Sequence, residues 1–124
     1  MKKILLIILA FIPMYSNGQN VDYIEYDLDN GLHVILHQDK KVPLVVTSVM
    51  YHVGAKDENP ERTGFAHFFE HLLFEGTKNI GRGEMDKIIE RNGGSYNANT
   101  NQDRTYYYEL LPSNKLDLGL WIES

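Results

Sequence analysis

Residues 63–77 read TGFAHFFEHLLFEGT, and positions 65–74 of this stretch are apolar except for His67, Glu70 and His71. On a helix that turns about 100° per residue, these three side chains fall within one arc of roughly 100°. The opposite side of the helix is apolar and carries Phe65, Ala66, Phe68, Phe69, Leu72 and Leu73. The pattern predicts a helix over residues 64–75 that is buried in the fold and open to chemistry through one polar window.

Histidines four residues apart lie one turn apart, so both rings can direct a nitrogen at one tetrahedral ion. A neighbouring carboxylate that does not bind the metal can take a proton from a water that the metal acidifies. Here the acid directly precedes the second histidine, which gives the reversed pattern H-x-x-E-H. The alternative is a hydrogen-bonded pair of core histidines, with Glu70 pointing to solvent.

The composition suits one ordinary globular domain or part of a larger one. The 124 residues are 43% hydrophobic and 23% charged. Cysteine is absent from the sequence. Disulfides, thiolate metal sites and a cysteine nucleophile are therefore excluded.

The first 18 residues have the pattern of a secretory signal peptide. Lys2 and Lys3 precede an apolar run over residues 4–12, and Ser16 and Gly18 favour cleavage before Gln19. The run is about half of the roughly 20 residues that a membrane span needs, so no stable span is expected after cleavage. A retained anchoring helix is the alternative. We expect an exported protein of the bacterial periplasm or the extracellular space.

Cleavage would remove two of the 12 basic residues and none of the 17 acidic ones, which takes the net charge from −5 to −7. No basic cluster remains, so nucleic acid is not an expected partner.

Turn and periodicity signals divide the rest of the chain into short elements. Two strands are expected around a two-residue turn at Asn30-Gly31, and residues 42–54 suit a central strand. Thr63 is a candidate cap for the helix that follows it. Further expected elements are a helix over about 83–92 that Gly93-Gly94 ends, strands in SYNANT and RTYYYELL, and a helix from Pro112-Ser113.

Two longer blocks resemble the M16 metallopeptidases, a family that includes pitrilysin, insulysin and the mitochondrial processing peptidase. They are GAKDENPERTGFAHFFEHLLFEGTKN, residues 54–79, and NGGSYNANTNQDRTYYYELLP, residues 92–112. The resemblance extends over nearly all of residues 22–123 and implies an α+β fold, M16/LuxS-like. In this fold a mostly antiparallel sheet has helices packed on one face.

The same resemblance implies functions for particular residues. His67 and His71 would bind one Zn²⁺, and Glu70 would activate a zinc-bound water to hydrolyse peptides or unfolded polypeptides. The strand at residues 95–100 resembles the edge strand along which these enzymes bind an extended substrate by β-augmentation. Asn97 and Ala98 match the family's Asn-Ala pair and are candidate substrate-binding residues. A local hydrogen bond is the alternative for Asn97.

The sequence departs from the family in what it lacks. A catalytic zinc needs three protein ligands, and the family's third, a glutamate, is expected beyond Ser124. Glu123 comes too early to be assigned. A second family domain that contributes an Arg-Tyr pair is also missing. Residues 19–124 are therefore expected to be a truncated N-terminal domain, incomplete in this chain, whose activity needs a second M16-like domain or subunit.

Other readings follow from weaker signals. A non-catalytic M16-like subunit that binds peptides or an active partner is the alternative function, and the intact H-x-x-E-H pattern speaks against it. We expect structural roles for the histidines outside the motif and solvated charges at Glu75 and Glu109. Those histidines are His33, His37 and His52.

Overall fold

The computed structural model describes residues 20–124, so the predicted signal peptide lies outside the described residues. The described residues fall into two units, one that ends at Lys40 and one that spans Lys41–Ser124. None of the helices in the described part is long and apolar enough to cross a membrane.

The first unit contains an antiparallel hairpin of β1 (Ile24–Asp27) and β2 (His33–Leu36). The predicted two-residue turn is wrong, because the loop between the hydrogen bonds of Leu28 and Leu32 has three residues, 29–31. Gly31 N donates to Leu28 O at 2.8 Å, and Gly31 has a positive φ of 86°. A tight turn followed by a left-handed glycine is the usual form of a three-residue hairpin loop.

The second unit is built on a three-stranded antiparallel sheet in the order β3-β5-β4. The strands are β3 (Leu44–Tyr51), β4 (Ser95–Thr100) and β5 (Thr105–Pro112). The prediction of a central strand at residues 42–54 is wrong for this sheet, since β5 pairs on both sides and β3 on one. The other edge of the sheet is β4.

The helices of this unit lie close to the positions expected from the sequence. They are α2 (Phe65–Leu72), α3 (Glu84–Arg91) and α4 (Leu116–Glu123), with short 3-10 turns at Ala55–Asp57 and Ser113–Lys115. Gly93, at a φ of 76°, follows the end of α3 in the left-handed conformation that glycine favours.

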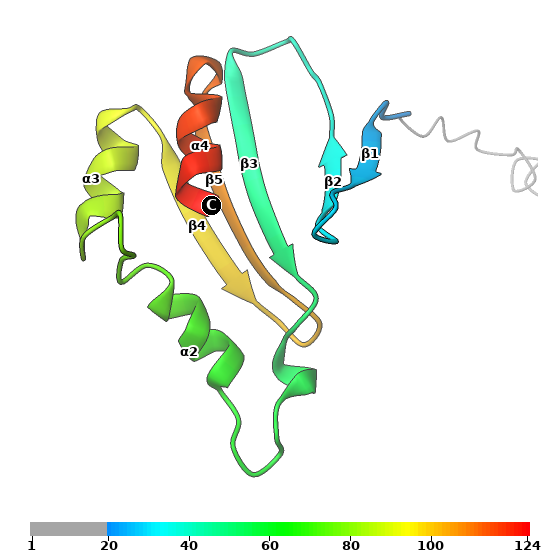
Figure 1. Ribbon diagram of the computed structural model, residues 1–124, viewed down its shortest axis with the longest axis vertical. Helices are drawn as coiled ribbons and strands as arrows, with labels where there is room; N and C mark the ends of the chain where they lie inside the picture. The colour runs from blue at the N-terminus through cyan, green and yellow to red at the C-terminus, as the bar shows by residue number, and fades with distance from the viewer. Residues whose placement is uncertain (1–19) are drawn as a thin grey trace, which may run out of the picture. The chain divides into compact units, whose positions relative to one another are not determined.

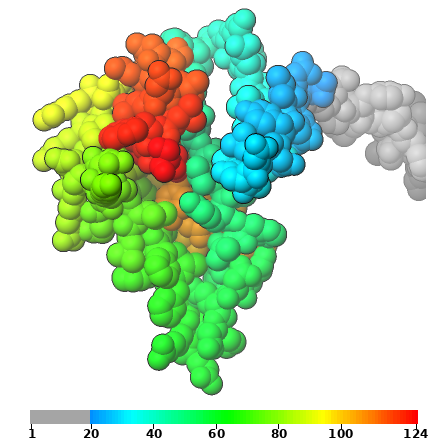
Figure 2. Space-filling model, viewed as in Figure 1, coloured from blue at the N-terminus to red at the C-terminus, as the bar shows by residue number. Residues whose placement is uncertain are grey.

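The helices pack on one face of the sheet, as the resemblance implied. Alternate residues of β5 are buried, from Thr105 to Leu111. Leu111 and Ile89 of α3 are both fully buried, and a Cβ on Gly94 would lie 2.5 Å from Leu111 Cδ2. Helix α4 lies against β3 and β5 (Figure 1). Figure 2 shows α4, in red, in front of the sheet, with little of the orange β5 visible. The fold is therefore α+β.

Glu109 lies on this buried face and has an exposed fraction of 1%. The expectation of a solvated charge at this position is wrong, because strand alternation puts Glu109 on the same side as Tyr107 and Leu111. Thr47 Oγ1 donates to Glu109 Oε2 at 2.6 Å. Burial, and then the hydrogen bond with Glu109, raise the pKa of Glu123 on α4 to about 8.

Candidate metal and catalytic site

His67 and His71 lie together on the polar side of α2, and both side chains are exposed. Their Nε2 atoms are 3.1 Å apart, and their ring centroids are separated by 4.7 Å with the planes at 48°. The four-residue spacing places both rings on one face of the helix, as predicted. One neutral ring can also donate a hydrogen bond to the other at this distance.

This geometry fits two ligands of one zinc ion. Zinc–nitrogen bonds are about 2.05 Å long, so nitrogens 3.1 Å apart subtend an angle of roughly 98° at a shared ion. That angle is close to tetrahedral. Two ligands do not complete a catalytic site, which needs three. Among residues 20–124 the structure contains no cluster of three or more His, Cys, Asp or Glu side chains placed to hold a metal.

Glu70 lies on the side of α2 that faces the sheet. Its exposed fraction is 8%, and its Oε2 accepts a hydrogen bond from Thr100 Oγ1 at the end of β4. The alternative in which Glu70 points to solvent is therefore wrong. Burial, and then the nearby charge of Glu70, contribute to raising the pKa of Tyr107 on β5 to about 12. The glutamate of the H-x-x-E-H pattern, directly before the second histidine, is therefore buried between α2 and the sheet.

The apolar side of α2 is exposed in the described part of the chain. The prediction of a buried helix is wrong there, because the helix meets the sheet through its polar side. Phe68, Phe69 and Leu73 have exposed fractions between 53% and 58%. A cavity of about 860 Å³ borders this side and is lined in part by Phe65, Phe69 and Leu72.

Glu58 caps the N-terminus of α2, a role that we predicted for Thr63. The N-cap residue is Gly64, at a φ of 96°, and it has no side chain with which to bond the first turn. Glu58 Oε2 instead accepts from Gly64 N, and its Oε1 from Ala66 N, both at 2.7 Å. The hydrogen bond from Ala66 N, and then that from Gly64 N, lower the pKa of Glu58. The cap comes from six residues upstream, so no local cap signal reveals it.

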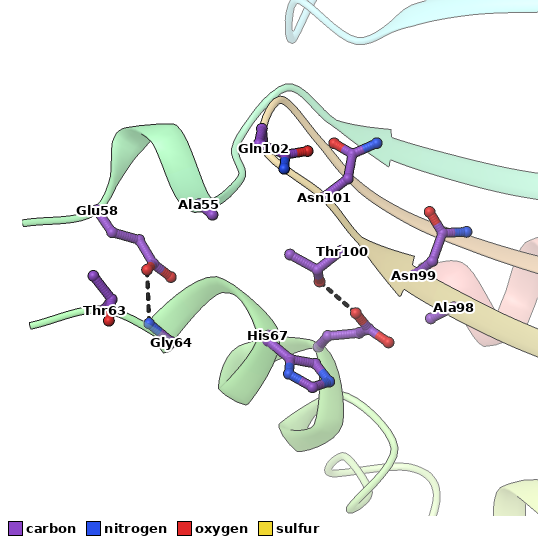
Figure 3. Close-up of a pocket in the computed structure, with 11 residues that line it drawn as sticks. Ala55, Glu58, Thr63, Gly64, His67, Ala98, Asn99, Thr100, Asn101 and Gln102 are labelled. Carbon is purple, nitrogen blue, oxygen red and sulfur yellow. Dashed lines mark hydrogen bonds between the residues drawn. The ribbon is translucent and has the colours of Figure 1, made fainter.

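A cleft of about 560 Å³ separates the start of α2 from the end of β4. Figure 3 shows His67 on one side of it and Ala98, Asn99 and Thr100 on the other. Its lining residues are Ala55, Glu58, Thr63, Gly64, His67, Glu70 and the segment Ala98–Gln102. The cleft therefore brings one predicted ligand, the predicted base and Ala98 together.

Asn97 is not among the residues that line the cleft. Its side-chain Oδ1 accepts a hydrogen bond from Ala98 N at 2.8 Å, which is the local bond considered as the alternative. Its substrate-binding role remains a prediction.

The other histidines have partners that are not residues of this cleft. His33 Nδ1 is 2.8 Å from Asp27 Oδ1, and this contact raises the pKa of His33. His37 Nδ1 lies 2.6 Å from Asp22 O, and His52 Nε2 is 3.2 Å from Lys56 Nζ.

Comparison with known proteins matches residues 33–121 to the family model described as insulinase, peptidase family M16. A protein named zinc protease PqqE from Helicobacter pylori is 40% identical over 94 residues, which are 75% of this chain and 21% of that protein. The uncharacterized zinc protease YmxG of Bacillus subtilis is 35% identical over 83 residues, 67% of this chain and 20% of that protein.

The solved structures include a similar protein. The crystal structure of a protease from Helicobacter pylori superposes with a TM-score of 0.79 at 37% identity, covering 83% of this chain and 25% of that one. The chain spans about a fifth of the length of the curated relatives that it matches.

Proposed function

Because this chain belongs to the insulinase family of peptidases, family M16, we propose that it carries the zinc-binding helix and the catalytic base of an exported zinc metalloendopeptidase. The observation that carries this proposal is the pair of Nε2 atoms 3.1 Å apart, with the buried Glu70 between the two histidines in sequence. The substrates would be peptides or unfolded polypeptides.

His67 and His71 would hold the zinc ion, and the chemistry it would supply is polarisation of the scissile carbonyl and a lowered pKa of a bound water. The two histidines would hold the ion through their neighbouring Nε2 atoms, with the proton of each ring on Nδ1. Glu70 lies in the cleft wall, where its carboxylate can accept a proton from the attacking water and return it to the leaving amine. Burial and the hydrogen bond from Thr100 hold this carboxylate against the sheet, and His67 lines the same cleft.

The substrate strand would bind along β4. In the described sheet β4 pairs with β5 on one side, which leaves its other edge available to a further strand. Such binding uses main-chain groups and therefore accepts many sequences. Ala98, which lines the cleft, and Asn97, its neighbour on β4, would lie beside the bound backbone.

We propose that a further polypeptide segment completes the site. It would supply the third ligand and cover the apolar side of α2, as a later part of a longer chain or as a second M16-like domain or subunit. Two observations support it, the two-histidine site and the exposed phenylalanines and leucines on α2. Exposed apolar surface of this kind marks a protein contact.

Export rests on the signal-like sequence of residues 1–18, a basic start followed by a short apolar run and small residues. The protein would then act in a bacterial periplasm or outside the cell.

The test is hydrolysis of an unstructured peptide by the full-length purified protein. We expect cleavage that a zinc chelator abolishes and added Zn²⁺ restores. Peptide binding without cleavage in the zinc-loaded protein would favour the alternative, a non-catalytic M16-like subunit.

A further inference from the structure

Thr100 joins the strand that lines the cleft to the proposed base. It is the last residue of β4, and its Oγ1 donates to Oε2 of Glu70, a residue that is 30 positions away in sequence (Figure 3). No described residue bonds the other carboxylate oxygen, Oε1, and that atom is not a buried unsatisfied group. Oε1 is therefore accessible to solvent, and Glu70 is one of the residues that line the cleft.

The hydroxyl of Thr100 is held in place by its surroundings. Thr100 pairs with Thr105 at the end of the β4–β5 ladder, and Thr105 Oγ1 donates to Val53 O at 3.0 Å. Asn101 N, next along the chain, donates to Arg104 O at 2.9 Å and closes the turn. A β-branched side chain on a paired strand has few rotamers, so its hydroxyl has few directions to point in.

A glutamate carboxylate otherwise turns freely about its last torsion, because that torsion has broad minima. A hydrogen bond from a hydroxyl to a charged oxygen is among the stronger ones and fixes one oxygen. When Oε2 is held, Oε1 is the oxygen that remains to exchange a proton in the cleft.

We propose that Thr100 is a positioning residue for Glu70, which fixes the direction of the base relative to the strand that receives the substrate. The inference rests on the proposed function, since it assigns Thr100 a part in the same reaction. Thr100 makes no hydrogen bond to His67 or His71. Its loss should therefore impair the proton transfer and leave metal binding intact.

The decisive variants are Thr100→Val, which removes the hydroxyl and keeps the shape, and Thr100→Ser, which keeps the hydroxyl. In the full-length protein we expect Thr100→Val to lower kcat about 10- to 100-fold, the range for partners that orient a site residue. KM and the zinc dissociation constant should change less than about 3-fold. Thr100→Ser should recover most of the lost kcat. In the metal-free protein, Thr100→Val should unfold at a lower temperature than Thr100→Ser.

Thr47→Val is the matched control. It removes another threonine-to-glutamate hydrogen bond, that of Thr47 Oγ1 to Glu109 Oε2, which lies outside the cleft. This control should lower the unfolding temperature and leave kcat unchanged.

A further comparison separates positioning from a general loss of structure. In a Glu70→Gln background, Thr100→Val should leave the small residual rate unchanged, because the base that it orients is already gone. An unchanged kcat in Thr100→Val, or an equal loss of kcat in Thr47→Val, would overturn the inference. An inactive wild type, or Glu70→Gln as active as wild type, would instead contradict the proposed function.

Discussion

The Nε2 atoms of His67 and His71 lie 3.1 Å apart on one turn of α2. Glu70, which directly precedes His71, is buried against the sheet. The polar side of this helix therefore carries two exposed imidazole rings and one buried carboxylate that is hydrogen-bonded to the sheet. The two histidine nitrogens suit a metal ion, and the Glu70 carboxylate suits proton transfer beside it. The following predictions concern the full-length protein.

Replacing either histidine should remove zinc binding. Each of His67→Ala and His71→Ala removes one of the two proposed ligands on α2. Loss of a residue that only hydrogen-bonds to a ligand lowers metal affinity by up to about 100-fold, so we expect a larger fall in zinc affinity here. Competition with a chelating dye measures this. His37→Ala is the control, since His37 bonds a backbone carbonyl outside the site. Unchanged affinity in both variants would show that the ring pair is a hydrogen-bonded pair.

Glu58→Ala should lower both stability and zinc affinity. The change removes the acceptor for Gly64 N and Ala66 N, so the first turn of α2, next to His67, loses its cap. Thermal unfolding and zinc titration measure the two effects. Glu61→Ala, in the same loop, is the control, because Glu61 enters the loop's hydrogen bonding through its backbone N–H. Equal behaviour of the two variants would mean that the cap is without consequence.

Asn97→Ala should raise KM for a peptide substrate and leave kcat nearly unchanged, if its side chain contacts the substrate backbone in the bound state. Steady-state kinetics with one extended peptide measures this. Ser95→Ala is the control, two residues earlier on the same exposed side of β4. An unchanged KM would leave Asn97 with its local bond to Ala98 N alone.

The Glu109–Glu123 contact should make stability depend on pH. The pKa of Glu123 is raised to about 8 from 4.5, so between these values the folded state holds a proton that the unfolded state has released. The free energy of unfolding therefore falls as pH rises through this window. Glu123→Gln should match wild type near pH 4.5 and unfold at a higher temperature near pH 8. A difference that is independent of pH would contradict this assignment.

Local patterns predicted the elements of the second unit because each carries its own signal. SYNANT corresponds to β4 at both ends, and the glycine after Asn92 follows the end of α3. The helical period likewise placed His67, Glu70 and His71 on one side of α2. These signals depend on residues a few positions apart, which is the range that sequence periodicity covers.

Features that depend on distant residues were wrong or missed. Glu58 caps a helix that begins seven residues later, and Glu109 is buried by α4, whose position depends on the whole sheet. The polar window of α2 borders the cleft, and the hydrogen bond of Glu70 with Thr100 of β4 is a contact that the helical pattern does not predict. Glu70 and Glu109 each accept a hydrogen bond from a threonine that is distant in sequence, Thr100 and Thr47. Hydrophobic periodicity contains no information about such pairs.

The central claim is that Glu70 is the base of a zinc peptidase. The most direct test measures zinc content and peptide hydrolysis together in the full-length wild type and in Glu70→Gln, a change that keeps the size of the side chain and removes its charge. We predict the same zinc content in both proteins and a loss of hydrolysis by at least about 100-fold in the variant, within the range for general acid–base groups. Equal hydrolysis at equal zinc content would contradict the claim.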